Sequence, residues 1–421
     1  MAEFRFIHCS DLHIDSPFKG LTTQAPSLAN DLRESTFKAF QNIARFALQE
    51  KVDAILIAGD VFDGADRSLQ AQLKFRRILK ELSDQNIKSF IVHGNHDPLN
   101  SWAHTLEWPE HVTIFPGNKV HHVPVKKDGK NVAWIYGISY PEKEVTENLA
   151  LKFKKNEEEG FSIGLLHTNV GQQPGHDNYA PCSINDLVSR NFDYWALGHI
   201  HEFKVLREND PAIVYSGNTQ ARHLNETGQK GCCLVTLNKD CPPEIRFIAT
   251  DVVSYRSATV DLQNAENIND VLRNIQVQCE EIAKESIPRE GVVARLTLTG
   301  RTSVHKELQS LGVMNALTEE IQTFFEGHSP WLSVELNTQT AGIFDIENLK
   351  EGKDFIADLV NLCDETEKKE LNNKIRDSIK PVFETWVGRK YLENFSPEEM
   401  DTLIKKSRNL ALDQLVDQDN T

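Results

Sequence analysis

The segment FRFIHCSDLH, residues 4–13, sets the pattern on which the fold of this chain is built. Its first six residues, Phe4–Cys9, are mostly apolar, and a run of this kind and length is typical of a buried strand. The segment then changes to a serine, a carboxylate and an imidazole around Leu12. Because such residues rarely lie inside a strand core, we expect the strand to end at Cys9 and to present Asp11 and His13 at its carboxyl end.

Two downstream segments repeat this form, an apolar run followed by a glycine and a polar residue: DAILIAGD at residues 53–60 and SFIVHGN at residues 89–95. Between the three runs, apolar residues recur at spacings of three and four, which predicts helices over Leu32–Glu50 and Leu69–Gln85. Strands that alternate with helices form parallel sheets with helices on their faces. We therefore predict an α/β fold with layers of sheet and helix.

Later parts of the chain extend this domain and then change in character. Further strand-like runs are Val132–Ile138, Ser162–Leu166, Tyr194–Leu197, Ile213–Ser216 and Cys232–Leu237. From about residue 255, shorter strand and helix patterns predict a small α+β domain. Asn337–Lys353 is expected to be a linker, and the residues after it have a charged, helical pattern. We predict domains over residues 1–250, 255–340 and 350–421.

The composition is that of a globular protein. The chain has 421 residues, 39% of them hydrophobic and 26% charged, which is enough apolar material for ordinary packed cores. No apolar run approaches the ~20 residues that span a bilayer, and the N-terminus lacks the pattern of a signal peptide. The seven cysteines are scattered without a C-x-x-C pair, which argues against a zinc ribbon or a disulfide framework. We expect a cytoplasmic protein with no membrane association.

Charge and histidine are both distributed unevenly. The net charge of −16 divides into −4 over residues 1–250 and −12 over residues 251–421. The first part therefore leaves room for a local basic groove that could bind nucleic acid. Of the 15 histidines, 13 lie at or before His223. In a chain without paired cysteines, this excess indicates a metal site in the first domain.

Polar residues follow five of the predicted strands, and they are expected to lie together because the carboxyl ends of parallel strands meet at one edge of a sheet. In the extended D-x-H and H-x-H pairs, both side chains also point to the same side. Gly59, Gly94 and Gly198 lie just before members of this set, where the chain must turn off a strand. The predicted metal ligands are Asp11, His13, Asp60, Asn95, His167, His199 and His201.

The donor set indicates which metals and which chemistry to expect. Imidazole nitrogens with carboxylate and amide oxygens, and no thiolate, suit Mn²⁺, Fe²⁺ or Zn²⁺ better than Ca²⁺ or Cu⁺. Two cations about 3.5–4 Å apart can clamp a phosphoryl group and lower the pKa of a bound water. Asp60 can bridge two such cations, and His96, beside Asn95, is the expected proton donor to the departing oxygen. The pattern predicts metal-dependent hydrolysis of phosphate esters.

Other histidines and cysteines have a simpler interpretation as packing or surface residues. Cys232 and Cys233 lie in a predicted strand, where small buried side chains suffice as an explanation. The histidines interpreted in this way are His8, His93, His104, His111, His121, His122 and His176.

The order of the motifs resembles the calcineurin-like metallophosphoesterase superfamily, whose fold is a layered β-sandwich flanked by helices. Within it, the chain is similar to the SbcD/YhaO-type DNA repair exonucleases, nuclease subunits that work with an SMC-like ATPase. The run from SGN at 216–218 through RHLNE at 222–226 to KGC at 230–232 is similar to the segment after the H-x-H pair in that family. The continuation DSPF at 15–18 looks more like the YhaO branch. The resemblance is specific over residues 1–240.

The resemblance implies roles for the predicted residues. One cation would take Asp11, His13, Asp60 and His201, and the other would take Asp60, Asn95, His167 and His199. The expected cofactor is a pair of divalent cations, Mn²⁺ first, with Mg²⁺, Fe²⁺ and Zn²⁺ as alternatives. His96 matches the catalytic histidine of the family, and Asp97 is expected to orient it. Some relatives have a second active-site histidine three residues after the bridging aspartate, where this chain has Asp63.

The function that the resemblance implies is an Mn²⁺-dependent DNA exonuclease or endonuclease acting in DNA repair, with DNA and an SMC-like ATPase as partners. Arg222, with His223 beside it, is the candidate for gripping a backbone phosphate; a surface salt bridge is the alternative for Arg222. The α+β domain would be the family's capping domain. A homodimer is a further expectation, and the oligomeric state is left open.

Two other functions compete with the nuclease. The first is a phosphatase or small-molecule phosphodiesterase of the same superfamily; protein phosphatases there typically follow the bridging aspartate with an arginine, which DVFDG at 60–64 lacks. The second is a non-catalytic scaffold that docks an ATPase, although such a scaffold would be expected to have lost ligands. The helices of residues 350–421 are expected either to dock the ATPase or to pack on the first domain.

Overall fold

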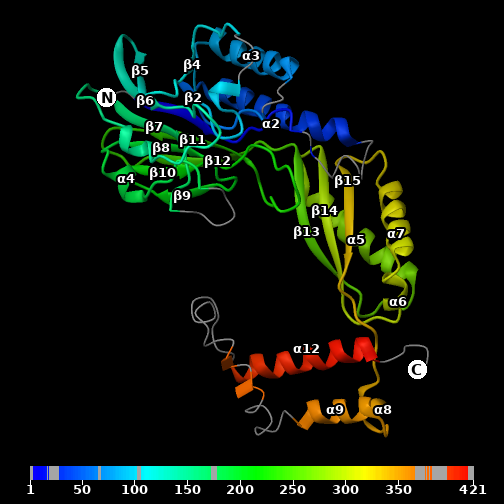
Figure 1. Cartoon of the computed structure of the whole chain (residues 1–421). Coiled ribbons are helices and arrows are strands. Elements are labelled where there is room, and N and C mark those ends of the chain that lie inside the picture. Colours follow the sequence, from blue (N-terminus) through cyan, green and yellow to red (C-terminus); the bar gives the residue numbers. More distant parts are fainter. Residues whose placement is uncertain are drawn as a thin grey trace. The chain divides into compact units, whose positions relative to one another are not determined.

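The computed structural model in Figure 1 describes residues 3–16, 18, 28–64, 68–101, 106–171, 178–365, 375, 377–378, 380–381 and 396–415. The chain divides into two compact units, which we describe separately. The first contains residues 1–257, 279–295 and 325–335, and the second contains residues 258–278, 296–324 and 336–421. The boundaries of the three domains drawn from the sequence remain predictions.

Two six-stranded sheets form the centre of the first unit. The first sheet has the order β12-β11-β1-β2-β3-β4, and its strands are β1 Phe4–Cys9, β2 Ala54–Ala58, β3 Lys88–Val92, β4 Val112–Ile114, β11 Gly231–Leu237 and β12 Glu244–Ala249. The second has the order β5-β6-β7-β8-β10-β9, and its strands are β5 His121–Lys127, β6 Lys130–Gly137, β7 Phe161–His167, β8 Tyr194–Gly198, β9 Lys204–Arg207 and β10 Ala212–Tyr215.

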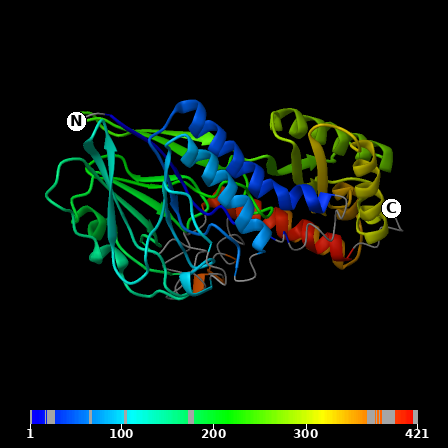
Figure 2. The same cartoon turned by 90° about the horizontal axis from the view of Figure 1, so that it is seen from above.

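The sheets pack face to face around a fully buried core that includes Phe6 and Leu56 from the first sheet and Ile163 and Ala196 from the second. The strands alternate their side chains, so Ile7 and Ile57 point to the opposite face of the first sheet. There they pack beneath the helices α2 (Ala29–Glu50) and α3 (Leu69–Asp84), which lie side by side in Figures 1 and 2.

The outer face of the second sheet is also covered. Trp195 and Tyr215 pack there against Phe153 and Leu187, next to the short helices η3 (Leu149–Lys152) and α4 (Ile184–Val188). The first unit is therefore a β-sandwich with helices on its outer faces, which confirms the predicted fold class.

The parallel strands bring their carboxyl ends to one edge. Strands β1, β2 and β3 are parallel neighbours in the first sheet, and β7 and β8 are parallel neighbours in the second. Strand β1 has the predicted bounds, Phe4–Cys9, whereas helix α2 begins three residues before the predicted Leu32. The helix α3 begins at its predicted residue because Ser68 caps it, accepting a hydrogen bond from the Ala71 backbone at 3.1 Å.

A third, three-stranded sheet follows in the chain, with the order β13-β14-β15. Its strands are Val253–Asp261, Gly291–Thr299 and Trp331–Thr338, and the helices between them are α5 (Ile268–Ser286), α6 (His305–Leu308) and α7 (Leu311–Phe324). This is the predicted α+β pattern. The predicted linker over residues 337–353 is wrong in part, because it contains the helix α8 (Ile346–Lys350). Asp345 caps the first turn of this helix by accepting a hydrogen bond from the Asn348 backbone.

Two further helices are described near the C-terminus, α9 (Phe355–Glu365) and α12 (Pro397–Leu415). The second unit buries Ala357 and Val360 of α9 and Met400 and Leu412 of α12. Three aromatic residues of the predicted helical region over residues 350–421 lie outside the described residues: Trp386, Tyr391 and Phe395. No helix in the described part of the chain is long and apolar enough to cross a membrane.

Candidate metal centre

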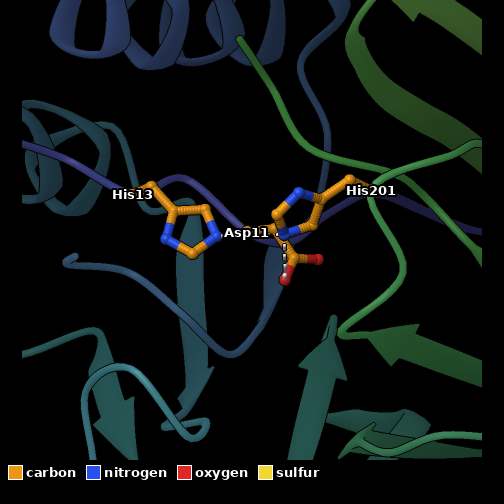
Figure 3. A group of neighbouring side chains, drawn as sticks. All are labelled: Asp11, His13 and His201. Carbon is orange, nitrogen blue, oxygen red and sulfur yellow. Dashed lines mark hydrogen bonds and ion pairs between the residues drawn. The ribbon is translucent and has the colours of Figure 1, made fainter. Parts of the chain in front are cut away.

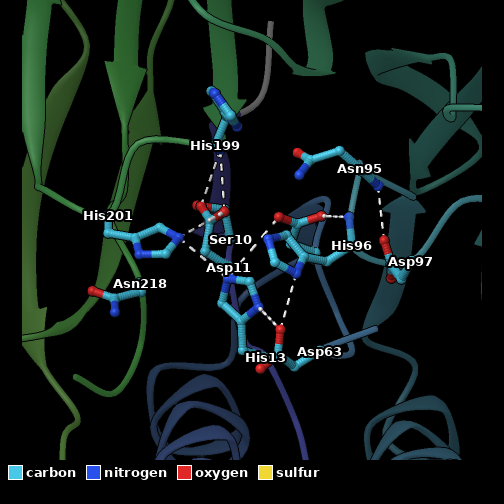
Figure 4. Close-up of polar contacts among 12 residues, drawn as sticks. Ser10, Asp11, His13, Asp63, Asn95, His96, Asp97, His199, His201 and Asn218 are labelled. Carbon is cyan, nitrogen blue, oxygen red and sulfur yellow. Dashed lines mark hydrogen bonds and ion pairs between the residues drawn. The ribbon is translucent and has the colours of Figure 1, made fainter. Parts of the chain in front are cut away.

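The predicted ligands lie at the edge where β1, β2, β3, β7 and β8 end, and Figure 4 labels five of them: Asp11, His13, Asn95, His199 and His201. Asp11, His13 and His167 are completely buried, and Asp60 is 1% exposed. Three groups of side chains, each with its ligand atoms within 4.8 Å of one another, occur among the described residues. They are Asp11–His13–His201, Asp11–Asp60–His167 and His13–Asp63–His96.

The first group is drawn in Figure 3, where a dashed line joins the His201 ring to the Asp11 carboxylate and the His13 ring lies to one side of them. The Nε2 atoms of the two imidazoles are 3.2 Å apart, and His201 Nε2 is 3.8 Å from Asp11 Oδ1. The Nδ1 atom of each ring faces an outer carboxylate: Glu226 Oε1 at 2.6 Å from His201 and Asp63 Oδ1 at 3.6 Å from His13. In the neutral His201 ring, which donates from Nδ1 to Glu226, Nε2 therefore presents its lone pair toward His13 Nε2.

The second group is built around His167. Its Nδ1 donates to the carbonyl oxygen of Ala58 at 2.9 Å, so in the neutral ring Nε2 is the acceptor. That Nε2 atom lies 3.0 Å from Asn95 Oδ1 and 3.5 Å from Asp60 Oδ2, which are themselves acceptors. Lone pairs brought this close without a proton between them repel one another, and a cation between them removes the repulsion. The donor set at both groups therefore fits bound divalent cations.

Burial and neighbouring imidazoles set the charge states of this region. Burial lowers the pKa of His13 to about 3, which keeps its ring neutral, as a metal ligand must be. At Asp11, burial acts to raise the pKa, but positive charge on the His201 and His167 rings, when these are protonated, outweighs it and lowers the pKa to about 2. Ser10 Oγ also donates to Asp11 Oδ2 at 2.5 Å. Asp11 is therefore held as a carboxylate.

His199 is positioned differently from the other predicted ligands. Its backbone N–H donates to both carboxylate oxygens of Asp11, at 3.2 and 3.1 Å. Its ring centroid lies 5.2 Å from that of His167, but its ring is in none of the three groups found among the described residues. The structure brings His199 to the edge of the centre, and its role as a ligand remains a prediction.

Four of the predicted metal ligands have a strained backbone conformation. Asp11, His13, Asp60 and His199 all have positive φ angles, at 51°, 43°, 50° and 99°. Non-glycine residues rarely adopt this left-handed region, and such residues cluster where the surrounding structure fixes a functional geometry. In this protein the strain lies on four of the seven predicted ligands.

Close packing explains why two of the three motif glycines, Gly94 and Gly198, are glycines, and the sequence did not reveal this. Gly59 has a φ of +94° and does require a glycine for its turn. Gly94 and Gly198 are not in that region, but a Cβ at Gly94 would lie 2.8 Å from the His167 ring of the other sheet, and one at Gly198 only 1.9 Å from the Ala58 carbonyl oxygen. These two glycines allow the two sheets to approach closely enough for the ligands to meet.

Asp63, not Asp97, holds the candidate proton donor. His96 Nδ1 lies 2.9 Å from Asp63 Oδ1, and this hydrogen bond raises the pKa of His96. The other carboxylate oxygen of Asp63 accepts from Ser16 Oγ at 2.9 Å and pairs with Arg222 at the same distance. The His96 side chain is 40% exposed and its ring centroid is 4.9 Å from that of His13, so it stands at the open edge of the centre.

The prediction that Asp97 orients His96 is corrected by these contacts. Asp97 is completely buried, accepts hydrogen bonds from the backbone of Val61 at 2.9 Å and Gly94 at 2.8 Å, and pairs with the His93 ring at 2.9 Å. It therefore ties the loop after β2 to the loop after β3, the two loops that carry Asp60 and Asn95.

The two predicted substrate contacts differ in position. The Arg222 side chain is 14% exposed and its Nη1 pairs with Asp63 Oδ2 at 2.9 Å, next to His96. Arg222 therefore forms a salt bridge, which was the alternative to phosphate binding, but this salt bridge lies at the centre and not on the exposed surface. His223 is 57% exposed and its Nε2 is 3.3 Å from Glu226 Oε1. Whether either residue binds substrate remains a prediction.

Glu226 is the residue at this centre that sequence reasoning missed. It is almost completely buried and contacts both His201 and the segment around Arg222. The signal that could have found it is its position in RHLNE at residues 222–226, a motif in which the sequence indicates a site role only for Arg222 and His223.

Comparisons with known proteins identify the family. The family model "Calcineurin-like phosphoesterase" matches residues 4–203, and the model for the middle domain of the metallophosphoesterase YhaO matches residues 255–339. A protein of Bacillus subtilis (strain 168), named "Uncharacterized metallophosphoesterase YhaO", is 33% identical over 418 residues, which cover 99% of this chain and 98% of that protein. The chain belongs to the calcineurin-like metallophosphoesterases, in the YhaO-type branch.

This metallophosphoesterase is also similar to proteins named "DNA double-strand break repair protein Mre11". The one from Methanocaldococcus jannaschii is 25% identical over 283 residues, covering 64% of this chain and 73% of that protein. The one from Thermoplasma acidophilum is 29% identical over 236 residues, covering 52% and 57%. The family membership and the ligand groups together support divalent-metal binding at the centre described above.

Proposed function

We propose that this metallophosphoesterase is a cytoplasmic DNA nuclease, acting on phosphodiester bonds in DNA repair, with Mn²⁺ as its preferred cation. The observation that carries the proposal is the placement of His96: an exposed imidazole, held by Asp63, beside buried groups of metal ligands. A nuclease needs this combination, because the cleaved bond must contact the cations while the departing oxygen receives a proton.

Each side chain would have a distinct task. Asp11, His13 and His201 would hold one cation, and Asn95 and His167 the other, with Asp60 between them. Bound divalent cations supply charge for a phosphoryl group and a water of lowered pKa. Since Nδ1 of His96 is engaged by Asp63, Nε2 is the atom that would donate a proton to the leaving oxygen.

DNA is favoured over a small phosphate ester by the names of the relatives that match this chain. The proteins from M. jannaschii and T. acidophilum that match this chain are both named for DNA double-strand break repair. In addition, the Arg222 guanidinium lies beside Asp63 and His96, where it would add positive charge next to a bound backbone phosphate. A phosphatase or a non-catalytic scaffold is an outcome that the following experiment would reveal.

The test is an assay of the purified full chain with end-labelled single- and double-stranded DNA and, in parallel, a chromogenic phosphomonoester. We expect Mn²⁺-dependent shortening of DNA, loss of this activity in EDTA and its return when Mn²⁺ is added back, with little hydrolysis of the monoester. Hydrolysis of the monoester with intact DNA would show a phosphatase instead. Bound Mn²⁺ without hydrolysis of either substrate would favour the scaffold.

We also propose that the C-terminal helices dock an SMC-like ATPase, the partner that the family resemblance implies. Phe355 and Leu362 of α9 are 68% and 50% exposed. They are seven residues apart and therefore lie on the same side of the helix. An exposed apolar stripe on an amphipathic helix is a common means of binding a groove or another helix.

Changing both residues of this stripe to aspartate, Phe355→Asp with Leu362→Asp, is expected to abolish co-purification with the ATPase while nuclease activity is retained. The substitutions add charge to a surface that is already exposed, so folding should be little affected. Val277→Asp on α5 is the matched control, because Val277 is also 50% exposed. Normal association of the double variant would contradict docking through α9.

A further inference from the structure

Glu226 lies at the junction of two functional groups of this centre. It is 7% exposed, and each of its carboxylate oxygens has two partners. Oε1 faces His201 Nδ1 at 2.6 Å and His223 Nε2 at 3.3 Å, and Oε2 accepts from Asn218 Nδ2 at 3.0 Å and the Arg222 backbone N–H at 2.7 Å. A buried carboxylate with this many polar contacts is held in one orientation.

The contact with His201 decides which nitrogen of that ring can bind a cation. A carboxylate accepts the proton of Nδ1, so the lone pair of His201 lies on Nε2, the atom that faces Asp11 and His13. The carboxylate also makes the ring more basic, which strengthens binding of a cation.

Lys230, four residues further along the chain, holds the same ligand by its backbone. Its side chain is almost completely buried, and Nζ donates to the carbonyl oxygen of His201 at 2.8 Å. The ring and the main chain of His201 are therefore fixed separately, both by residues of the segment between β10 and β11.

From Glu226 the contacts continue in a closed ring around this side of the centre. The Arg222 backbone N–H reaches Glu226, the Arg222 guanidinium pairs with Asp63, and Asp63 faces His13 Nδ1 at 3.6 Å. His13 Nε2 then returns to His201 Nε2 at 3.2 Å. A change at Glu226 would thus displace a predicted ligand and the nearby arginine together.

We infer that Glu226 is a positioning residue: it sets His201 Nε2 toward the cation of the Asp11–His13–His201 group and fixes the main chain that carries Arg222. This inference deepens the proposed function, since it specifies how one of its two metal sites is built. It requires metal binding but does not require that the substrate be DNA.

The experiment compares Glu226→Ala and Glu226→Gln in the full chain, with Mn²⁺ binding measured by calorimetry and by electron paramagnetic resonance. Loss of such an outer partner typically weakens metal binding about 10- to 100-fold. We expect Glu226→Ala to weaken one of two Mn²⁺ sites by this factor and to leave the other unchanged. Glu226→Gln keeps an oxygen that can accept from His201 Nδ1, and it should restore part of the affinity.

Asp251→Asn is the matched control for loss of a buried carboxylate. Asp251 is also 7% exposed and is a member of none of the three ligand groups; its carboxylate pairs with Arg289 at 2.6 and 3.0 Å, and its backbone, which the substitution keeps, bonds Lys230. It should lower thermal stability without changing either Mn²⁺ affinity.

Two results would overturn the inference: a folded Glu226→Ala protein that binds both Mn²⁺ ions with parental affinity, or Glu226→Gln binding no better than Glu226→Ala. If Glu226→Ala does not fold, unchanged Mn²⁺ spectra and affinities in both Glu226→Gln and Lys230→Met would overturn it. Failure of DNA cleavage with these binding effects intact would instead contradict only the proposed nuclease function.

Discussion

Asp60→Asn is expected to abolish hydrolysis and to leave the protein with at most one bound Mn²⁺. Asp60 Oδ2 lies 3.5 Å from His167 Nε2 and 4.0 Å from His13 Nε2, so this oxygen stands between the two groups of ligands. An amide of the same shape has no negative charge to offset two cations. We expect kcat to fall by about a thousandfold or more, because the cations both orient and activate the reacting groups.

The measurement combines the Mn²⁺ content of the dialysed protein with its rate of DNA cleavage. Asp251→Asn again serves as the control, since it removes a buried carboxylate outside the centre. Full activity and an unchanged Mn²⁺ content in Asp60→Asn would remove the basis of the two-cation interpretation.

His96→Ala should have a different effect, with a large loss of turnover and both cations retained. The ring is held by Asp63 at the exposed edge of the centre, and loss of a general acid typically costs about 10²- to 10⁴-fold in rate. Asp63→Asn should cause a smaller loss, because the ring remains but its orientation and its raised pKa are no longer supported.

Single-turnover rates and Mn²⁺ titrations of the two variants separate chemistry from metal binding. His122→Ala, at an exposed histidine on the edge strand β5, is the control for loss of an imidazole. Loss of a cation in His96→Ala would mean that His96 is itself a ligand and that the proton donor lies elsewhere.

Much of the fold could be predicted from the sequence because the information is local. The apolar run of β1 and the polar residues after it are adjacent in the chain, and so are those of β2 and β3. Parallel strands then bring distant ends together by a general rule, so Asp11, Asp60 and His167 could be grouped without any knowledge of contacts.

The parts that could not be predicted depend on side chains that meet only in three dimensions. Asp97 is next to His96 in the sequence, whereas Asp63 lies in an earlier motif, and only the folded loops show that the Asp63 carboxylate faces the His96 ring while Asp97 binds loop backbone. Glu226 is a single carboxylate among 62 acidic residues, and nothing in its neighbours shows that it is buried. The short helix α8 was missed because five residues carry too little periodicity to identify.

The crowding at Gly198 has a mechanical consequence. A methyl group there would meet the carbonyl oxygen of Ala58, so the main chains of the two sheets touch at the point where their polar side chains converge. Asp11, Asp60 and Asn95 are carried by the first sheet, and His167 and His201 by the second. A cation held by both sets would therefore cross-link the two sheets of the sandwich. The sheets could not separate at this edge without release of the cation, and release of the cation would remove the cross-link.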